Sequence, residues 1–240
     1  MTIELPTSVI EASTKSPKVL IIFSAPKTGK TSLISKLENN LLIDLENGSD
    51  FVSAMKLKAN TYQELHAICE KVKEAGKPYK YITLDTATAL EDLCLPLALK
   101  LYQQTAMGKT YTGDILSLPQ GGGYKYLRDA FQLMIEKVKG CADRVILLGH
   151  VKDKSIEKEG KEVTARELAL TGKLSSITCA NADAIGFIYR EGNKCIITFE
   201  TNNELICGAR PAHLRNRKFT ISEEAVDGTL TTYWDRIFID

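Results

Sequence analysis

The sequence predicts an α/β fold with a mainly parallel central sheet and late antiparallel strands. The first observation is a series of short, continuous apolar runs, typical of strands buried on both faces, at 18–24, 41–45, 81–85 and 144–149. The second is that segments with helical periodicity separate these runs, as in βαβ units. The third is that the later runs follow one another closely enough for hairpins, at 184–189, 195–199 and 205–207.

The remaining segments complete the expected order of elements. Apolar residues at helical spacing predict helices at 31–38, 62–74, 88–104 and 127–138. Residues 1–17 are expected to form an irregular lead-in, and 107–123 a loop rich in Gly, Thr and Tyr. Residues 151–174 alternate acids and bases without apolar periodicity, which predicts a mobile excursion. With no repeat or low-complexity linker, we expect 18–240 to form a single domain.

Composition restricts the class of protein. The chain has 240 residues, of which 44% are hydrophobic, and a net charge of +1, so bulk charge gives no argument for nucleic-acid binding. The six cysteines form no CxxC pair and are expected to be apolar core residues in a reducing compartment. Neither a signal peptide nor an apolar run near the roughly 20 residues of a membrane span is present. A cytoplasmic protein with no membrane partner is therefore expected.

The first strand ends in a segment that resembles the phosphate-binding pattern GxxxxGK[ST], with Ser24 in place of the first Gly. In such a loop Gly29 lets backbone amides curl around phosphate oxygens, and Lys30 reaches the β- and γ-phosphates. A chance Gly-Lys-Thr turn is the alternative, but a buried strand before it and a helix after it favour the loop. The expected ATP-binding residues are Ser24, Ala25, Pro26, Lys27, Thr28, Gly29, Lys30, Thr31 and Ser32.

Nucleotide hydrolysis also needs carboxylates, and two strands end in them. Asp85 closes the run 81–85 and, with the Thr31 hydroxyl, is the candidate ligand of Mg²⁺. Its alternative role is the N-cap of the following helix. The residue after it is Thr86 rather than the Glu that many AAA+ ATPases have there. The run 41–45 is followed by Glu46, the second candidate carboxylate. The alternative for Glu46 is an ordinary acidic residue of a solvated loop.

These elements resemble the RecA and KaiC-type ATPase core, and more closely the short phage-encoded RecA-like ATPases of the single-strand-annealing (Sak) type. The resemblance covers about residues 18–190. It rests on four segments, namely 26–31, 44–50 (Asp-Leu-Glu-Asn-Gly-Ser-Asp), 122–128 (Gly-Gly-Tyr-Lys-Tyr-Leu-Arg) and 149–152 (Gly-His-Val-Lys). It implies that Lys30, Glu46, Asp85 and His150 are the catalytic residues. Glu46 would be the general base, and His150 would sense the γ-phosphate where RecA itself has Gln.

The resemblance also implies two DNA-binding segments. The first, around 107–125, offers Lys109, Tyr111, Tyr124 and Lys125. Aromatic side chains among basic residues and glycines suit stacking on the bases of single-stranded DNA. The second, 151–173, has six basic residues against five acids, which is weak support for a phosphate track, and a solvated loop is the alternative.

The most basic stretch is 208–218, which has no acid. Arg215 and Arg217 are candidates for a finger that reaches the γ-phosphate of a neighbouring subunit. A DNA contact and an ordinary basic hairpin remain alternatives.

The leading hypothesis is an ATP- and Mg²⁺-dependent ATPase that acts with single-stranded DNA in phage recombination, annealing or replication. A homo-oligomeric ring or filament, a single-strand-binding protein as partner and the bacterial host cytoplasm are implied with it. The alternatives are an ATP-switched loader or adaptor with little turnover, and a P-loop small-molecule kinase. The kinase is disfavoured because 86–143 holds only one arginine, Arg128.

Overall fold

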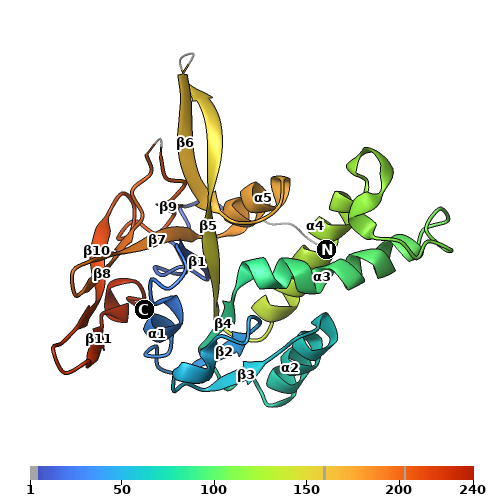
Figure 1. Ribbon diagram of the computed structural model, residues 1–240. Coiled ribbons are helices and arrows are strands. Elements are labelled where there is room, and N and C mark those ends of the chain that lie inside the picture. The colour runs from blue at the N-terminus through green and yellow to red at the C-terminus, as the bar shows by residue number, and fades with distance from the viewer. Residues whose placement is uncertain (1–4, 159–160, 203) are drawn as a thin grey trace.

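A single twisted sheet runs through the molecule, with helices on both faces (Figure 1). The computed structural model describes residues 5–158, 161–202 and 204–240. Residues 1–4 of the expected lead-in and 159–160 of the expected excursion lie outside the described residues. The strand order is β11-β10-β8-β7-β1-β5-β4-β2-β3, with β6 paired to β5 and β9 paired to β7.

The half of the sheet that contains the first strand is parallel, since β1 pairs with β5 and β7, β4 with β5 and β2, and β2 with β3. Its strands are β1 (Val19–Ser24), β2 (Asn40–Asp44), β3 (Lys56–Lys58), β4 (Tyr81–Asp85), β5 (Arg144–Lys158) and β7 (Ala184–Glu191). Every residue of β1, β2 and β4 is buried. Continuous apolar runs are what such two-sided burial requires.

Antiparallel strands extend the other half of the sheet beyond β7. They are β8 (Lys194–Thr198), β9 (Gly208–Ala209), β10 (Lys218–Glu224) and β11 (Leu230–Thr232). The predicted fold class, a mainly parallel sheet with late antiparallel strands, is therefore confirmed. The predicted strand at 205–207 is wrong, because the short strand β9 begins at Gly208, and β3, β10 and β11 were not anticipated.

Alternate residues of each buried strand face two separate cores. Ile21 and Phe23 of β1 pack into the core that four helices cover, whereas Leu20 and Ile22 pack against α1 and Trp234. The helices are α1 (Lys30–Ile34), α2 (Tyr62–Glu74), α3 (Ala87–Gln103), α4 (Gly123–Lys139) and α5 (Lys173–Asn181). Short 3-10 turns lie at Ser49–Phe51, Ile115–Ser117, Pro119–Gly121 and Trp234–Arg236. All six cysteines are free, and five of them are buried.

The excursion expected at 151–174 contains a regular β-hairpin, and its mobility stays a prediction. Strand β5 continues past the sheet and pairs in register with β6 (Lys161–Leu168), from Val151 opposite Leu168 onward, and this hairpin projects from the body (Figure 1). The helix α5 follows at Lys173. Outside the sheet, both faces of a two-stranded ribbon can meet water, so the apolar alternation that marks a half-buried strand is not required. The first helix also ends earlier than expected, at Ile34.

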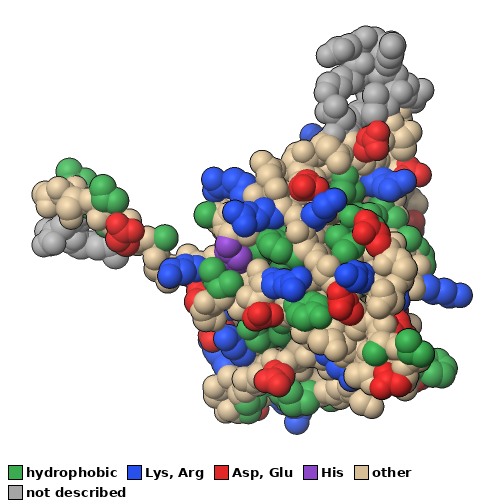
Figure 2. Space-filling view, turned by 90° about the vertical axis from the view of Figure 1, so that its left-hand side faces the viewer, with side chains coloured by type: hydrophobic (Ala, Val, Ile, Leu, Met, Phe, Trp, Pro, Cys, Tyr) green, Lys and Arg blue, Asp and Glu red, His purple; other side chains and the backbone are tan. Residues whose placement is uncertain are grey.

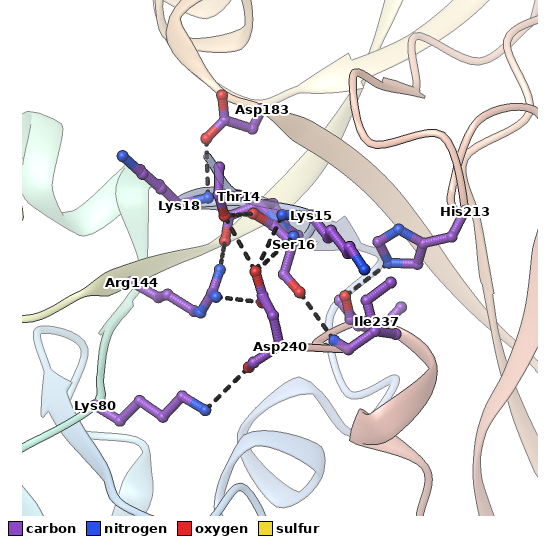
Figure 3. Close-up of polar contacts among 12 residues, drawn as sticks. Thr14, Lys15, Ser16, Lys18, Lys80, Arg144, Asp183, His213, Ile237 and Asp240 are labelled. Carbon is purple, nitrogen blue, oxygen red and sulfur yellow. Dashed lines mark hydrogen bonds and ion pairs between the residues drawn. The ribbon is translucent and has the colours of Figure 1, made fainter. Parts of the chain in front are cut away.

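Opposite the carboxyl ends of the parallel strands, Asp240 ties the segment before β1 to the sheet (Figure 3). Its carboxylate accepts hydrogen bonds from the backbone N–H groups of Lys15 (3.0 Å) and Ser16 (3.4 Å) and pairs with the Arg144 guanidinium at the start of β5. Hydrogen bonds from Ser16 and Lys15, together with the Arg144 charge, hold the pKa of Asp240 well below its usual range.

Before this tie, residues 5–12 extend away from the body and expose Leu5, Val9 and Ile10 (Figure 2). Within the described part of the chain, no helix is both long enough and apolar enough to cross a bilayer.

The start of α4 depends on a glycine. A Cβ on Gly123 would overlap the backbone carbonyl of Ile115, whereas a Cβ on Gly122 would make an ordinary contact 3.4 Å from the carbonyl oxygen of Pro119. We therefore expect Gly123→Ala to destabilise the protein by about 1–3 kcal/mol through overpacking, which lowers the melting temperature by several degrees. Thermal unfolding of Gly123→Ala beside Gly122→Ala measures this. Equal melting temperatures would show that the turn at Ile115 yields without cost.

Candidate functional site

Polar side chains gather at the carboxyl edge of the parallel strands. The register places Ser24 of β1 beside His150 of β5, and Asp44 of β2 beside Asp85 of β4. Because the strands are parallel, their chain ends meet at one edge of the sheet, where ligands of α/β proteins bind. The predicted residues Ser24, Asp85 and His150 are thus brought to one edge by backbone pairing alone.

The loop between β1 and α1 has the backbone form of a phosphate cradle. Gly29 has φ 103° and ψ 21°, a left-handed conformation that L side chains rarely adopt, and Lys27 also has a positive φ of 62°. The Thr28 hydroxyl donates to the Ala25 carbonyl at 2.8 Å and tightens the turn. Successive amides in such a turn form an anion-binding concavity. Since α1 has only five residues, the loop amides and Lys30 rather than a helix dipole supply the positive field.

Lys30 is only 6% exposed, and its ammonium donates to the Ser24 hydroxyl at 3.0 Å. Burial lowers the pKa of Lys30, although the charges of Asp85 and Glu46 act in the opposite direction. Ser24, which departs from the usual first Gly, is fully buried and gives this ammonium a partner inside the loop. The departure therefore fits the loop.

Thr31 and Asp85 form the pair expected of a magnesium site. The Thr31 hydroxyl donates to the Asp85 carboxylate at 2.6 Å. Burial raises the pKa of Asp85, and Glu46 and Asp44 add to the rise, while Thr31 and Lys30 oppose it. The described residues hold no group of three or more His, Cys, Asp or Glu that forms a protein-only metal cage. Mg²⁺ does not need one, because it commonly takes one or two protein oxygens and fills its shell with water and phosphate. The donor set fits Mg²⁺.

The alternative role of Asp85, capping the next helix, belongs to its neighbour. Thr86 is the N-cap of α3, and its hydroxyl accepts the backbone N–H of Ala89 at 3.3 Å. Asp85 is consequently left for the magnesium role.

A turn built on Asp44 presents Glu46. The buried Asp44 carboxylate accepts the backbone N–H groups of Glu46 (3.0 Å), Gly48 (3.3 Å) and Ser49 (2.9 Å). Burial alone would raise the pKa of Asp44, but these hydrogen bonds outweigh burial and lower it. Asp44 is thus committed to holding the turn, and Glu46 at the tip carries the partly exposed carboxylate.

Glu46 is held between two other strand ends. Its Oε1 accepts a hydrogen bond from the Thr86 hydroxyl and lies 3.0 Å from Nε2 of His150. Hydrogen bonds from two sides fix the direction of a carboxylate. The structure therefore brings together three predicted residues, Glu46, Asp85 and His150, through Thr86, to which the sequence assigned no role.

Arg190 is a site residue that the sequence did not reveal. It follows the apolar part of β7, its Nε donates to the Thr28 carbonyl at 3.1 Å, and its guanidinium lies over Gly29. Nη1 also pairs with Glu224 of β10 at 3.0 Å. A lone Arg after a strand carries no signal in the sequence, because only the order β8-β7-β1 places it beside the phosphate loop.

The candidate DNA residues lie apart from this edge. The connection with Lys109, Tyr111 and Tyr124 begins at the far end of α3, about 25 Å of helix from Thr86. The Tyr111 ring packs on Tyr102 and its hydroxyl donates to the Asp114 carbonyl, whereas Tyr124 is 37% exposed.

Lysine side chains of the same region and of the hairpin show no continuous basic track. Lys125 lies over the ring of Tyr126, and Lys152 and Lys154 of β5 both pair with Glu167 of β6. On the face in Figure 2, Lys and Arg are interspersed with Asp and Glu.

Arg215 and Arg217 lie between β9 and β10. Arg215 donates to the Arg210 carbonyl at 2.9 Å, and Arg210 pairs with Asp183, which precedes β7. Arg215 is therefore near the amino end of β7, whereas Arg190 meets the phosphate loop at its carboxyl end.

Comparisons with known proteins give a family match and a similar solved structure. The model of the family AAA_24, described as an AAA domain, matches residues 16–210, which is most of the chain. A similar solved structure is described as "Crystal structure of the RadB recombinase", with 12% identity, a TM-score of 0.46, and coverage of 91% of this chain and 92% of that one. No curated protein matches the chain.

Removing the buried charge of Asp85 should stabilise the protein in the absence of Mg²⁺ and nucleotide. Because burial raises the folded-state pKa of Asp85 above 3.8, its ionisation costs folding free energy once the pH exceeds that value. We expect Asp85→Asn to have the larger free energy of unfolding at pH 7.5, by a margin that shrinks as the pH falls toward 4. Urea unfolding at several pH values measures the margin.

Asp50→Asn is the matched control, because the hydrogen bond and charge of Lys58 lower the pKa of Asp50, so its loss should not stabilise. If the difference in unfolding free energy between Asp85→Asn and the unaltered protein does not change with pH, the raised pKa of the buried Asp85 carboxylate is contradicted.

Proposed function

We propose that this chain, which belongs to the AAA_24 family of AAA domains, binds ATP with Mg²⁺ at the loop Ser24–Thr31 and hydrolyses it. The observation that supports this most is the meeting of four groups at one sheet edge. These are the buried Lys30, the hydrogen-bonded pair of Thr31 and Asp85, and the Glu46 carboxylate. The charges of Lys30, Asp85 and Glu46 interact with one another. Phosphoryl transfer to water needs these three kinds of group.

Binding of the triphosphate would replace interactions that the loop makes within itself. The Lys30 ammonium, now on the Ser24 hydroxyl and the Ala25 carbonyl, would turn to the β- and γ-phosphate oxygens. Backbone amides around Gly29 would donate hydrogen bonds to the same anion, and Ser32 would contact the α-phosphate. When bound, Mg²⁺ supplies charge neutralisation of the β- and γ-oxygens, held by Thr31 and Asp85.

Glu46 is the proposed general base. Oε1 is fixed by Thr86 and His150, so the carboxylate is directed toward the edge where the terminal phosphate would lie. It would take a proton from the water that attacks that phosphate. His150 would position Glu46, and because it lies in β5, the strand that continues into the β5–β6 hairpin, it would report on the γ-phosphate to that hairpin.

The wider role follows the same proposal. We infer that single-stranded DNA stimulates turnover, with Tyr124, Tyr111, Lys109 and Lys125 as contacts. The protein would act in phage recombination, annealing or replication, like the ATPases of the Sak type. The protein would act as a homo-oligomeric ring or filament in the host cytoplasm, with a single-strand-binding protein as a further partner. Arg215 and Arg217 would act across subunits, because Arg215 lies near the amino end of β7, away from the phosphate loop.

Replacing Glu46 by Gln should separate binding from chemistry. Glu46→Gln keeps the shape of the side chain but removes the base, so we expect unchanged ATP affinity and turnover lowered by at least about 10²-fold. Steady-state hydrolysis with and without single-stranded DNA measures it. Lys30→Ala is the companion variant and should lose ATP binding.

Full activity of Glu46→Gln would move the base elsewhere. Tight ATP binding without turnover in the unaltered protein, with or without DNA, would instead favour a switch or adaptor.

Tyr124 is the sharper probe of DNA contact, because Tyr111 is tied into its own turn. If a base stacks on Tyr124, Tyr124→Ala should weaken binding of an oligothymidylate by about 1–3 kcal/mol. Fluorescence anisotropy measures the affinity, and Leu133→Ala, another exposed apolar side chain of α4, serves as control. Unchanged affinity of Tyr124→Ala would remove this connection from the DNA surface.

A further inference from the structure

A groove of about 360 Å³ begins directly beside the phosphate loop. Its floor is the outer side of α1 and the residues after it, with Ser32, Ser35 and Lys36. One wall is formed by Arg190 and Glu224, and the other by Phe51 in the turn after β2. The volume lies in the range of small-ligand sites, about 300–1,000 Å³.

The position of the groove fixes which part of a nucleotide it meets. Asp85 of β4, Glu46 in the turn after β2 and His150 of β5 meet beside the loop, so the terminal phosphate is assigned to that place. The groove lies past Ser32, toward β7 and β10. A triphosphate that runs along the loop with its last phosphate at Glu46 would direct its nucleoside past Ser32 and into this groove.

Phe51 is the second observation. It is 99% exposed, although the neighbouring Val52 packs against the core. An aromatic ring that gains nothing from folding and lines a ligand-sized groove is suited to stacking on a base. The turn that holds it is firm, because the Lys56 ammonium donates to the carbonyls of Ser49 (2.5 Å) and Val52 (3.0 Å) on both sides of Phe51.

The opposite wall is polar and charged. Arg190 and Glu224 form an ion pair of 3.0 Å with each side chain about half exposed. Arg190 also touches the phosphate loop through the Thr28 carbonyl. The wall therefore presents a cation next to the phosphates and a carboxylate farther out, which can accept hydrogen bonds from sugar hydroxyls.

We propose that this groove is the nucleoside subsite, in which the base stacks on Phe51 and the ribose lies against Arg190 and Glu224. The inference rests on the proposed function, since it needs a triphosphate in the loop. It assigns to Phe51 the discrimination between a nucleotide and a bare polyphosphate.

The test compares two probes, ATP and inorganic tripolyphosphate, each titrated with Mg²⁺ into the full chain by calorimetry. The unaltered protein should bind ATP more tightly than tripolyphosphate. Phe51→Ala should weaken ATP binding by about 5- to 100-fold and leave tripolyphosphate binding unchanged. Phe51→Tyr should restore ATP binding, and Met55→Ala, a half-exposed side chain of the same turn, should match the unaltered protein.

Three results overturn the subsite. These are equal affinities of the unaltered protein for ATP and tripolyphosphate, unchanged ATP binding in Phe51→Ala, or an equal loss of both probes in that variant, which would show that Phe51 only shapes the loop. If neither probe binds the unaltered protein, the proposed function fails and the subsite fails with it. Binding of both probes with no hydrolysis leaves the subsite standing and removes only the proposed turnover.

Discussion

The parallel pairing of β1, β5, β4 and β2 is the constraint on which the candidate site depends. These strands are buried on both faces of the sheet, so a charged side chain within them would lose its hydration without compensation. Ionisable groups can therefore appear only where the strands end. Because the strands run in one direction, those ends coincide, and Asp44 is paired with Asp85 while Ser24 is paired with His150.

The same constraint makes the edge costly to the folded chain. Burial lowers the pKa of Lys30 and raises that of Asp85, so each group is held in an environment that disfavours its charge. Each is partly relieved by the other. A bound phosphate would add negative charge beside Lys30, and a divalent cation would add positive charge beside Asp85. The unfavourable electrostatics of this edge would then become favourable interactions with a ligand. Such a trade of stability for binding is common at functional sites.

Part of this arrangement could be predicted from the sequence. The segments 62–74 and 81–85 have the observed bounds, because their apolar periodicity and turn residues are local signals. The positions of the 24–31 loop and of the carboxylates at strand ends could be predicted for the same reason, whereas their roles stay predictions. The β5–β6 hairpin was missed, since its strands are rich in charged residues and show no apolar alternation. Arg190 and Phe51 were missed because their importance comes from strand order and exposure, which neither residue signals locally.

The hairpin is attached to the candidate site by more than the continuity of β5. The chain that returns from β6 passes α3, where the Thr88 hydroxyl donates to the Ala169 carbonyl at 3.1 Å and the buried Glu91 carboxylate accepts the backbone N–H of Thr171 at 3.0 Å.

The helix α3 begins at Thr86, whose hydroxyl holds Glu46. Both strands of the hairpin are thus anchored to the two elements that orient Glu46, namely β5 through His150 and α3 through Thr86. A movement of Glu46 toward an attacking water would strain both anchors at once. If a bound nucleotide shifts Glu46, these two anchors would carry the shift to the projecting ribbon.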